Sequence, residues 1–249
     1  MTELLLINPN TTASITELVL GAAQRFASPG TRLRAVTGAF GPRYIASRVG
    51  YAIAGHAALD ALANDTGHKD AVVLACFGDP SLDALKEISE VPVVGMADAS
   101  ILQACTVGRR FSIVTGGERW KPMLEEFVAQ RGLASRLASV RTVTPTGADI
   151  ARDPKMAMGL LARSCTACGA DDGADVVILG GAGLAGLATK LETMVEVPLL
   201  DGVACAISTA EALARQALSK ATQGRSALPP PVESIGLSPG LAKLIGSSS

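Results

Sequence analysis

The chain contains one strand pattern twice, and this repeat constrains the fold more than any other feature. Two apolar runs, VVLAC at 72–76 and VPVVG at 91–95, are matched later by VVILGG at 176–181 and VPLLD at 197–201. In both places the second run follows a glutamate and continues Val-Pro. We interpret each run as a buried strand.

The opening strands of the two halves correspond as well. LLLINPN at 4–10 resembles FSIVTGG at 111–117. Matching runs are separated by about 104 to 107 residues throughout, and their order is the same in both halves. Patterns that match in order at a near-constant offset indicate a duplicated unit.

Helical periodicity fills the spaces between these strands. It follows the first strand, recurs at 52–64 (AIAGHAALDALAN) and precedes VVILGG at 156–168 (MAMGLLARSCTAC). Short apolar strands that alternate with helices predict parallel βαβ units. We predict an α/β fold with two pseudo-symmetric lobes, each an open, mostly parallel four-stranded sheet flanked by helices.

The predicted first lobe comprises residues 1–98 plus 206–249, and the second comprises 99–205. A helix at 203–219 would return the chain to the first lobe. Hydrophobic residues make up 48% of the 249 residues and aromatic residues only 3%, which suits helices packed closely on parallel sheets.

Composition also excludes several classes of partner. With few aromatic residues, a formal net charge of −1 and no basic stripe, we expect neither nucleic acid nor a membrane surface as a partner. The first residues are too acidic and the apolar run too short for a signal peptide, and no run approaches the roughly 18 residues of a membrane span. Five cysteines without a disulfide framework predict a cytoplasmic protein.

Ligands in open α/β sheets bind beyond the carboxyl ends of the strands. The loops expected there are 8–12, 76–79, 115–118 and 180–183. If the lobes face each other, these four loops line one cleft.

Cys76 is the residue in these loops best suited to chemistry. It ends a predicted strand and begins the turn CFGDPS, ahead of a helix expected near Pro80 or Ser81. A helix N-terminus favours a thiolate, so we predict that the pKa of Cys76 is lowered. We interpret Cys105 and Cys205 as core residues. Cys165 and Cys168 form a CTAC pair within a helical stretch, without a second pair, so we predict no metal site.

Small polar side chains and glycines in the loops are candidate binding groups. They are Asn10 and Thr11 after the first strand, Phe77 and Gly78 beside Cys76, Thr115, Gly116 and Gly117 in the second half, and Gly180 and Ala182 near its end. The alternative is that these residues have structural roles: they form turns, cap helices or allow a helix to pack closely on a strand. The glycines at 180–183 are not a dinucleotide fingerprint, because no acidic residue follows at the spacing that a ribose needs.

Residues 41–51 read GPRYIASRVGY and contain both tyrosines of the chain. Tyr44 and Arg48 are candidate binding residues, and an arginine here could clamp a carboxylate. The alternative is a solvated loop. Neither histidine lies in a hydrolase motif.

Together, INPNT after the first strand, CFGDP, VTGGERW and VVILGGAGLAG resemble the aspartate/glutamate/hydantoin racemase superfamily, nearest to its hydantoin and allantoin racemases. The resemblance covers almost the whole chain. It implies a two-lobed pseudo-symmetric fold and cofactor-free proton transfer at a carbon next to a carbonyl.

In that family two cysteines face each other across the substrate, one from each half. The first corresponds to Cys76. The second would lie in a Gly-Cys-Ala-Gly motif, and here Gly181 stands in its place. Arylmalonate decarboxylases also keep a single cysteine, although in the opposite half.

We therefore expect a racemase or isomerase that acts on a small hydantoin-like or amino-acid-derived substrate, with Cys76 as the thiol acid/base and no cofactor. The alternatives are a single-cysteine decarboxylase or lyase and a non-catalytic binder of small anions. We also expect a homo-oligomer.

Overall fold

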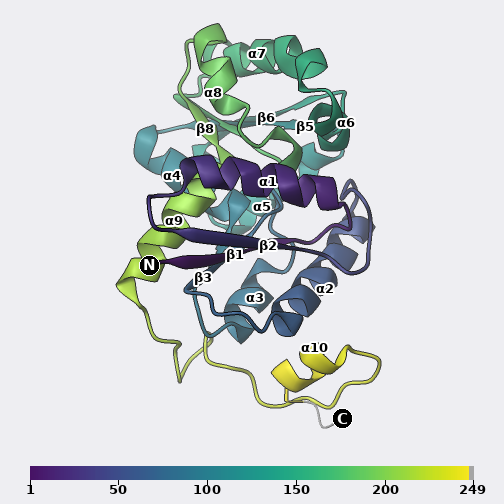
Figure 1. The fold of residues 1–249 in the computed structure, drawn as a ribbon. Coiled ribbons are helices and arrows are strands. Elements are labelled where there is room, and N and C mark those ends of the chain that lie inside the picture. Colours follow the sequence, from purple (N-terminus) through teal and green to yellow (C-terminus); the bar gives the residue numbers. More distant parts are fainter. Residues whose placement is uncertain (247–249) are drawn as a thin grey trace.

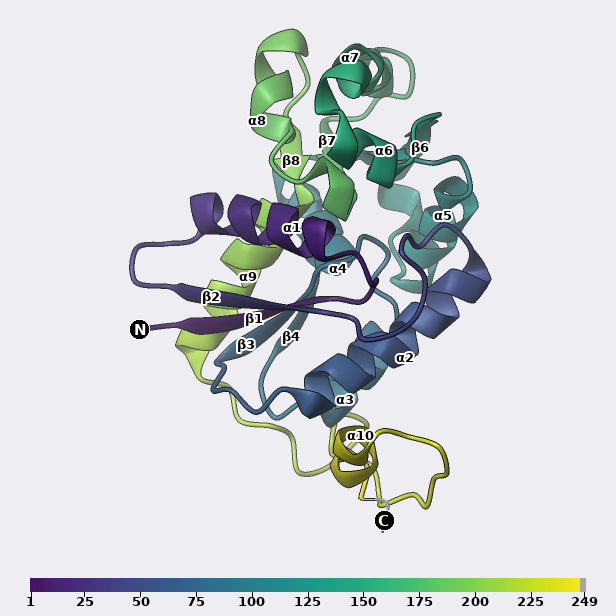
Figure 2. The same ribbon diagram turned by 45° about the vertical axis from the view of Figure 1, so that its right-hand side comes forward.

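The computed structural model describes residues 1–246 and contains two four-stranded sheets (Figures 1 and 2). The strand order is β2-β1-β3-β4 in one sheet and β6-β5-β7-β8 in the other, and all neighbours are parallel. The predicted α/β fold class is therefore confirmed. Residues 247–249 of the predicted first lobe lie outside the described range. The strands are β1 (Glu3–Asn8), β2 (Arg32–Thr37), β3 (Ala71–Leu74), β4 (Val93–Gly95), β5 (Phe111–Gly116), β6 (Leu137–Val143), β7 (Val176–Leu179) and β8 (Leu199–Asp201).

Helices connect every successive pair of strands, as parallel pairing requires. The α-helices are α1 (Ala13–Phe26), α2 (Arg48–Asn64), α3 (Leu82–Ile88), α4 (Met96–Val107), α5 (Trp120–Gln130), α6 (Gly147–Arg152), α7 (Pro154–Ala170), α8 (Ala188–Leu191), α9 (Gly202–Gln216) and α10 (Pro239–Leu244). Short 3₁₀ turns are η1 (Ala134–Arg136), η2 (Ala182–Leu184) and η3 (Glu192–Met194).

Several helix boundaries differ from the sequence-based expectation, and the backbone shows how two of these helices begin or end. The predicted loop at 41–51 ends at Ser47, because the Ser47 hydroxyl accepts a hydrogen bond from the Gly50 N–H and caps α2. The predicted helix at 203–219 ends at Gln216, and Ala217 then adopts a left-handed conformation with φ of 47°.

The two faces of the inner strands β1, β3, β5 and β7 are buried against different partners. Leu4 and Leu6 of β1 belong to a core that also contains Ile113 and Ile178 from the second sheet. Their neighbour Leu5 points to the opposite face, into a separate core with residues of α2 and α3. Because both faces are buried, the strands read as continuous apolar runs.

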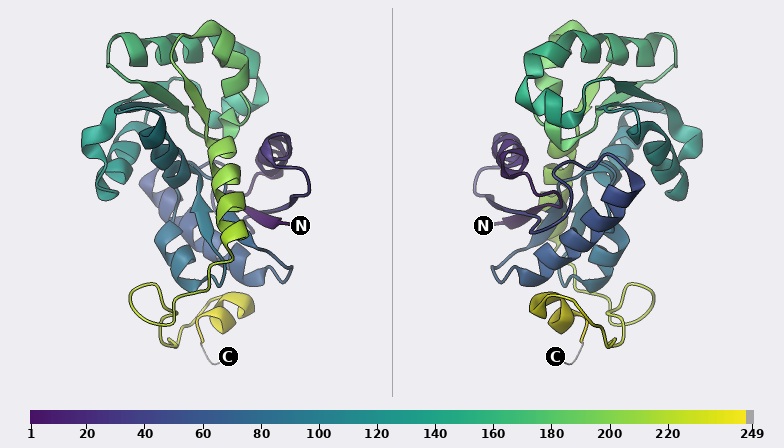
Figure 3. Two further views of the ribbon diagram at one scale, coloured as in Figure 1. Left: turned by 90° about the vertical axis from the view of Figure 1, so that its left-hand side faces the viewer. Right: turned by 90° about the vertical axis from the view of Figure 1, so that its right-hand side faces the viewer.

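The shared core joins the two halves. Figure 1 shows α1, α4 and α9 in the layer between the sheets, and buried residues of all three helices belong to this core. Helix α9 packs against α1, α4 and β3, so it returns the chain from the second half to the first (Figure 3). Its Glu211 carboxylate accepts hydrogen bonds from Ser28 and Thr31, 2.6–2.8 Å long, beyond the end of α1.

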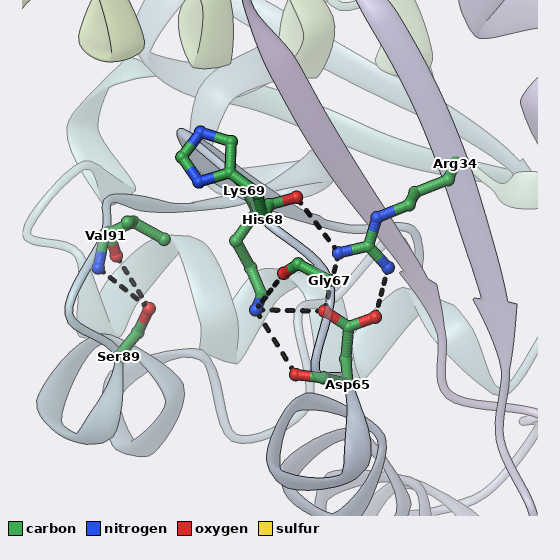
Figure 4. A network of polar contacts seen from close by, with 7 residues as sticks. All are labelled: Arg34, Asp65, Gly67, His68, Lys69, Ser89 and Val91. Carbon is green, nitrogen blue, oxygen red and sulfur yellow. Dashed lines mark hydrogen bonds and ion pairs between the residues drawn. The ribbon is translucent and has the colours of Figure 1, made fainter.

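A polar network on the first half fixes β2 to the segment after α2 (Figure 4). Arg34 and Lys69 both form ion pairs with Asp65, and Lys69 lies 2.9 Å from its carboxylate. Burial alone would raise the pKa of Asp65, but hydrogen bonds from the two cations lower it overall. This network holds the edge strand β2 in place and lies away from the loops predicted to form the site.

The last described helix, α10, packs on α2 of the first half and buries Leu241. Within residues 1–246, no helix is both long enough and apolar enough to cross a membrane.

Candidate active site

The site lies where the strand order of each sheet reverses direction. From β1 the chain continues to β2 on one side and then to β3 on the other, and β5, β6 and β7 repeat this arrangement. A crevice forms at the carboxyl ends of strands at such a point. A cavity of about 40 Å³ lies there, and residues of both halves line it.

The cavity brings together seven of the candidate residues named from the sequence. They are Asn10, Tyr44, Cys76 and Phe77 from the first half and Thr115, Gly181 and Ala182 from the second. The other named candidates, Thr11, Arg48, Gly78, Gly116, Gly117 and Gly180, lie outside its lining.

Cys76 is only 7% exposed, and its pKa is raised by burial and by the nearby charge of Asp79. The prediction of a lowered pKa is therefore wrong. Helix α3 begins at Leu82, close to the expected position, so the shift is set by burial of the thiol and by the Asp79 charge. The raised pKa keeps the Cys76 thiol protonated at pH 7.

Asp79 is a buried carboxylate three residues after Cys76 in the chain. It adopts a left-handed conformation, with φ of 54°, and its two oxygens accept hydrogen bonds from the N–H groups of Ala97 (3.1 Å) and Asp98 (2.7 Å) at the start of α4. Burial raises the pKa of Asp79 to about 7. Gly95 makes room for it, since a Cβ there would lie 2.2 Å from the Asp79 carboxylate.

The second half has a corresponding carboxylate from a different chain position. Asp201, at the end of β8, accepts hydrogen bonds from Gly186 N–H (2.7 Å) and Val203 N–H (2.9 Å). In each half a carboxylate thus ties the loop beside the cavity to the start of the next helix. In the first half this carboxylate belongs to the loop itself (Asp79), and in the second half it belongs to the end of strand β8 (Asp201).

Asn8 and Asn10 organise the loop after β1. Asn8 donates to the side chains of Asn10 (3.0 Å) and Thr16 (2.9 Å), and the Asn10 side-chain oxygen also accepts from Thr12 N–H (2.9 Å). The Asn10 oxygen is thus committed to the loop, and its amide Nδ2 is the group that can donate to a ligand. Thr11 donates its N–H to the Pro42 carbonyl (3.2 Å) and does not line the cavity.

Tyr44 crosses from the first half to the second. Its hydroxyl accepts a hydrogen bond from Gly147 N–H (2.9 Å) and donates to the Gly116 carbonyl (3.4 Å). Burial raises the pKa of Tyr44, so the phenol stays neutral at physiological pH. Gly116 packs closely, because a Cβ there would lie 2.7 Å from the Pro145 carbonyl oxygen. Gly117 donates its N–H to Val143 and supports the turn.

The glycines around 180 have different roles. A Cβ on Gly180 would lie 2.5 Å from the Phe77 ring, so this glycine permits close packing. Gly181 lines the cavity with φ of 134°, and a Cβ there would lie 3.5 Å from the Thr115 hydroxyl and 3.2 Å from Leu184. The position thus faces the cavity, but its backbone conformation is one that glycine alone adopts readily.

Arg48 does not reach the cavity. Its guanidinium makes two hydrogen bonds of 2.6 Å to Glu126 of α5, so its carboxylate partner belongs to the chain itself. The expectation that Arg48 clamps the substrate is corrected accordingly. The pair spans the two halves on the surface.

Seven further residues line the cavity that were not named as individual candidates from the sequence, although Gly183 lies in the predicted loop 180–183. The additional residues are Ile15, Ile45, Ala75, Trp120, Gly147, Gly183 and Leu184. Trp120 was detectable as the single tryptophan, directly after a candidate loop. Gly147 carries no such signal, because packing of α6 against Tyr44 and η2 brings it to the cavity.

The fold and the site together define a class of protein: a two-lobed α/β enzyme with a cavity between equivalent loops of its two halves. Comparison with protein families matches residues 4–210 to the family described as Asp/Glu/Hydantoin racemase. A hydantoin racemase of Paenarthrobacter aurescens is 36% identical over 85% of this chain and 90% of its own length. The crystal structure of allantoin racemase from Pseudomonas fluorescens is 34% identical, with a TM-score of 0.90, and the match covers 94% of this chain and all of that one.

An allantoin racemase from Klebsiella pneumoniae gives the same TM-score at 31% identity, over 97% of this chain and 99% of its own. The chain therefore belongs to the aspartate/glutamate/hydantoin racemase family, in the branch of the hydantoin and allantoin racemases. It is an isomerase of the racemase type.

Proposed function

We propose that the protein is a cofactor-independent racemase of small hydantoin-like substrates, with Cys76 as its thiol acid/base. One observation carries the proposal. Cys76 and Gly181 line the same cavity from equivalent loops of the two halves, so the cavity has a thiol on one side and none at the matching position. The hydantoin and allantoin racemases similar to this chain support the substrate class.

The reaction replaces the C5 proton on one face of the ring by a proton on the other face, and no heavy atom is transferred. Cys76 first gives its thiol proton to solvent; the thiolate then takes the C5 proton, and the electron pair of the C–H bond delocalises onto the neighbouring carbonyl oxygen as an enolate. A proton then returns to C5 from solvent on the opposite face, which leaves Cys76 a thiol again and the solvent with no net gain or loss of protons. With Gly181 on that opposite face, the returning proton comes from water beside the Thr115 hydroxyl.

The raised pKa of Cys76 fits a group that works in both directions. As a neutral thiol it can donate to an enolate, and as a thiolate of raised basicity it can remove a weakly acidic C–H proton. Asn10 Nδ2 and the Thr115 hydroxyl are the side-chain donors in the cavity that can stabilise the enolate oxygen. A well-placed donor of this kind typically contributes about 3–4 kcal/mol to the transition state.

The test is a proton NMR exchange screen in deuterium oxide over hydantoins, allantoin, amino acids and substituted malonates. We expect loss of the C5 proton signal of a hydantoin with the wild-type protein, and no loss with Cys76→Ala. Carbon dioxide release from a malonate would indicate the single-cysteine decarboxylase instead. Saturable binding without exchange or release would indicate the non-catalytic anion binder, and exchange retained in full by Cys76→Ala would exclude the thiol mechanism.

A further inference from the structure

Tyr44 belongs to the first half of the chain, but its hydroxyl group lies in the wall of the candidate active site that the second half forms. The hydroxyl oxygen accepts a hydrogen bond from Gly147 N–H at 2.9 Å, and both residues line the cavity. Gly147 in turn packs on the loop after β7, because a Cβ on Gly183 would lie 2.0 Å from the Gly147 carbonyl oxygen. That loop also contains Gly181. The Tyr44 hydroxyl and Gly181 therefore share one wall, whereas Cys76 reaches the cavity from the first half.

The hydrogen bonds of Tyr44 leave its proton available. The hydroxyl donates to the Gly116 carbonyl at 3.4 Å, whereas the usual O–H···O distance is about 2.5–3.0 Å. The bond from Gly147 N–H to the oxygen has a normal length. The oxygen is thus held firmly and the proton weakly, which suits a group that passes its proton to water in the cavity.

Thr115 supplies a second hydroxyl group on the same wall. The residue is 4% exposed and lines the cavity, and among residues 1–246 its hydroxyl has no hydrogen-bond partner. It lies 3.5 Å from the place that a Cβ at Gly181 would take. A buried hydroxyl of this kind is suited to bind water or a ligand. Water bound to Thr115 would stand beside the position of the missing second side chain.

Tyr44 is a better source of protons than water alone. Water that protonated the enolate without help would leave as hydroxide, and the pKa of water is about 15.7, against about 10 for a phenol. Burial raises the pKa of Tyr44, so the phenol is protonated between turnovers, while Gly147 N–H and the Trp120 indole favour the phenolate and oppose this rise. The same two groups would stabilise the phenolate that forms when the proton leaves.

We propose that Tyr44 is the second acid/base of the racemase, and that it acts through water at Thr115 on the face of C5 opposite Cys76. The O–H bond of Tyr44 breaks and its proton passes to the water, while another proton of that water forms the new C5–H bond with the electron pair of the enolate. The Tyr44 phenolate then takes a proton from solvent. In the reverse direction the steps run backwards and Cys76 donates. The proposal rests on the function proposed above and assigns the proton transfer that Gly181 cannot perform.

The test separates removal of the C5 proton from its return. 5-Methylhydantoin must lose and regain a proton to racemise, which circular dichroism measures. 5-(Fluoromethyl)hydantoin needs only the first step: once its C5 proton has passed to Cys76, the electron pair forms a C=C bond and fluoride leaves. A fluoride electrode measures this elimination, for the enantiomer whose elimination is abolished by Cys76→Ala.

We expect Tyr44→Phe to lower racemisation at least about 100-fold relative to fluoride release, as for the loss of a positioned acid or base. Tyr51→Phe is the matched control, because its hydroxyl donates to the Gly78 carbonyl at 2.7 Å and does not line the cavity. It should keep the wild-type ratio of the two rates. Both rates falling in proportion in Tyr44→Phe would overturn the proposal, since a residue that only supports the fold gives that result.

A second variant keeps the test decisive if Tyr44→Phe does not fold. The chain has two tyrosines, so 3,5-difluorotyrosine incorporated into Tyr51→Phe marks position 44 alone. Fluorination retains the hydroxyl and makes it a stronger acid, so racemisation should rise relative to fluoride release, and an unchanged ratio would overturn the proposal. A wild type that neither racemises the methyl compound nor releases fluoride would refute the proposed reaction itself, and the role of Tyr44 with it.

Discussion

Cys76 and Gly181 occupy equivalent positions in the two halves of the molecule. β3 begins at Ala71 and β7 at Val176, and each of the two residues lies five positions after the start of its strand. The registers also correspond, since Ala71 pairs with Leu4 and Val176 pairs with Phe111, residues of the first strand of each half. The two loops are therefore built alike, and only one of them carries a thiol.

Cys76 should react slowly with alkylating reagents in the ligand-free protein. Its raised pKa keeps the thiolate fraction small at pH 7, and the fraction should still be increasing at pH 9. Because the Asp79 charge contributes to this shift, Asp79→Asn should accelerate labelling. We expect Cys105, which is partly exposed, to react first. Iodoacetamide labelling against pH, followed by mass spectrometry, measures this, and fastest labelling at Cys76 at pH 7 would contradict it.

Asp79 should make the free energy of unfolding depend on pH. Its pKa rises from 3.8 to about 7 on folding, so the folded state binds the proton more tightly. The stability associated with the protonated form is complete below about pH 4 and is lost as the pH rises to about 7. The loss amounts to at most about 4 kcal/mol.

Urea denaturation at pH 5, 6, 7 and 8 tests this expectation. The wild type should lose more stability across this range than Asp79→Asn, which cannot ionise. Asp83→Asn changes a carboxylate whose side chain is 81% exposed, and it should follow the wild-type profile. Parallel profiles for wild type and Asp79→Asn would show that the buried carboxylate has no such effect.

Tyr44→Phe should weaken both the fold and the site. It removes the acceptor of Gly147 N–H and the donor to Gly116, so a polar group between the halves is left unpaired. The expected cost is about 1–3 kcal/mol in the free energy of unfolding. Tyr51→Phe removes a hydroxyl that bonds within the first half, and it should reduce deuterium exchange less. An equal loss of exchange in both variants would argue against a special role for Tyr44.

The sequence alone was sufficient to predict the repeat, the fold class and the loop that contains Cys76. These depend on apolar runs and on the residues that follow them, both of which are local. Strands β2 and β6 had no such pattern, because most of their residues are half-buried and include polar side chains such as Arg34 and Arg141.

The environment of each site residue was not predictable in the same way. A lowered pKa for Cys76 followed from its expected distance to a helix, whereas its burial depends on how the two halves pack. Arg48 stood beside a candidate tyrosine, and only the structure shows that α5 supplies its partner Glu126. Long-range packing thus decides which polar residues remain available to a ligand.

Gly181→Cys would place a second thiol at the position equivalent to Cys76. The backbone there has φ of 134°, which side chains rarely adopt, so the variant must strain or shift the loop. We expect Gly181→Cys and Gly181→Ala to be destabilised by a similar amount, about 1–3 kcal/mol, because the strain comes from the backbone. Gly21→Ala is the matched control. It lies in α1 with no atom within 4 Å of the added Cβ, and it should be stabilised by about 0.5–1 kcal/mol.

Comparison of Gly181→Cys with Gly181→Ala then separates the effect of backbone strain on stability from the effect of the added thiol on proton transfer. If the loop shifts enough to present the new thiol, Gly181→Cys should exchange the C5 proton of a hydantoin faster than Gly181→Ala, since a positioned acid or base is typically worth about 10²–10⁴-fold in rate. Thermal unfolding and deuterium exchange measured on the same preparations give both quantities. A Gly181→Cys protein as stable as the wild type, with exchange no faster than that of Gly181→Ala, would contradict both the strain at this position and its place opposite Cys76.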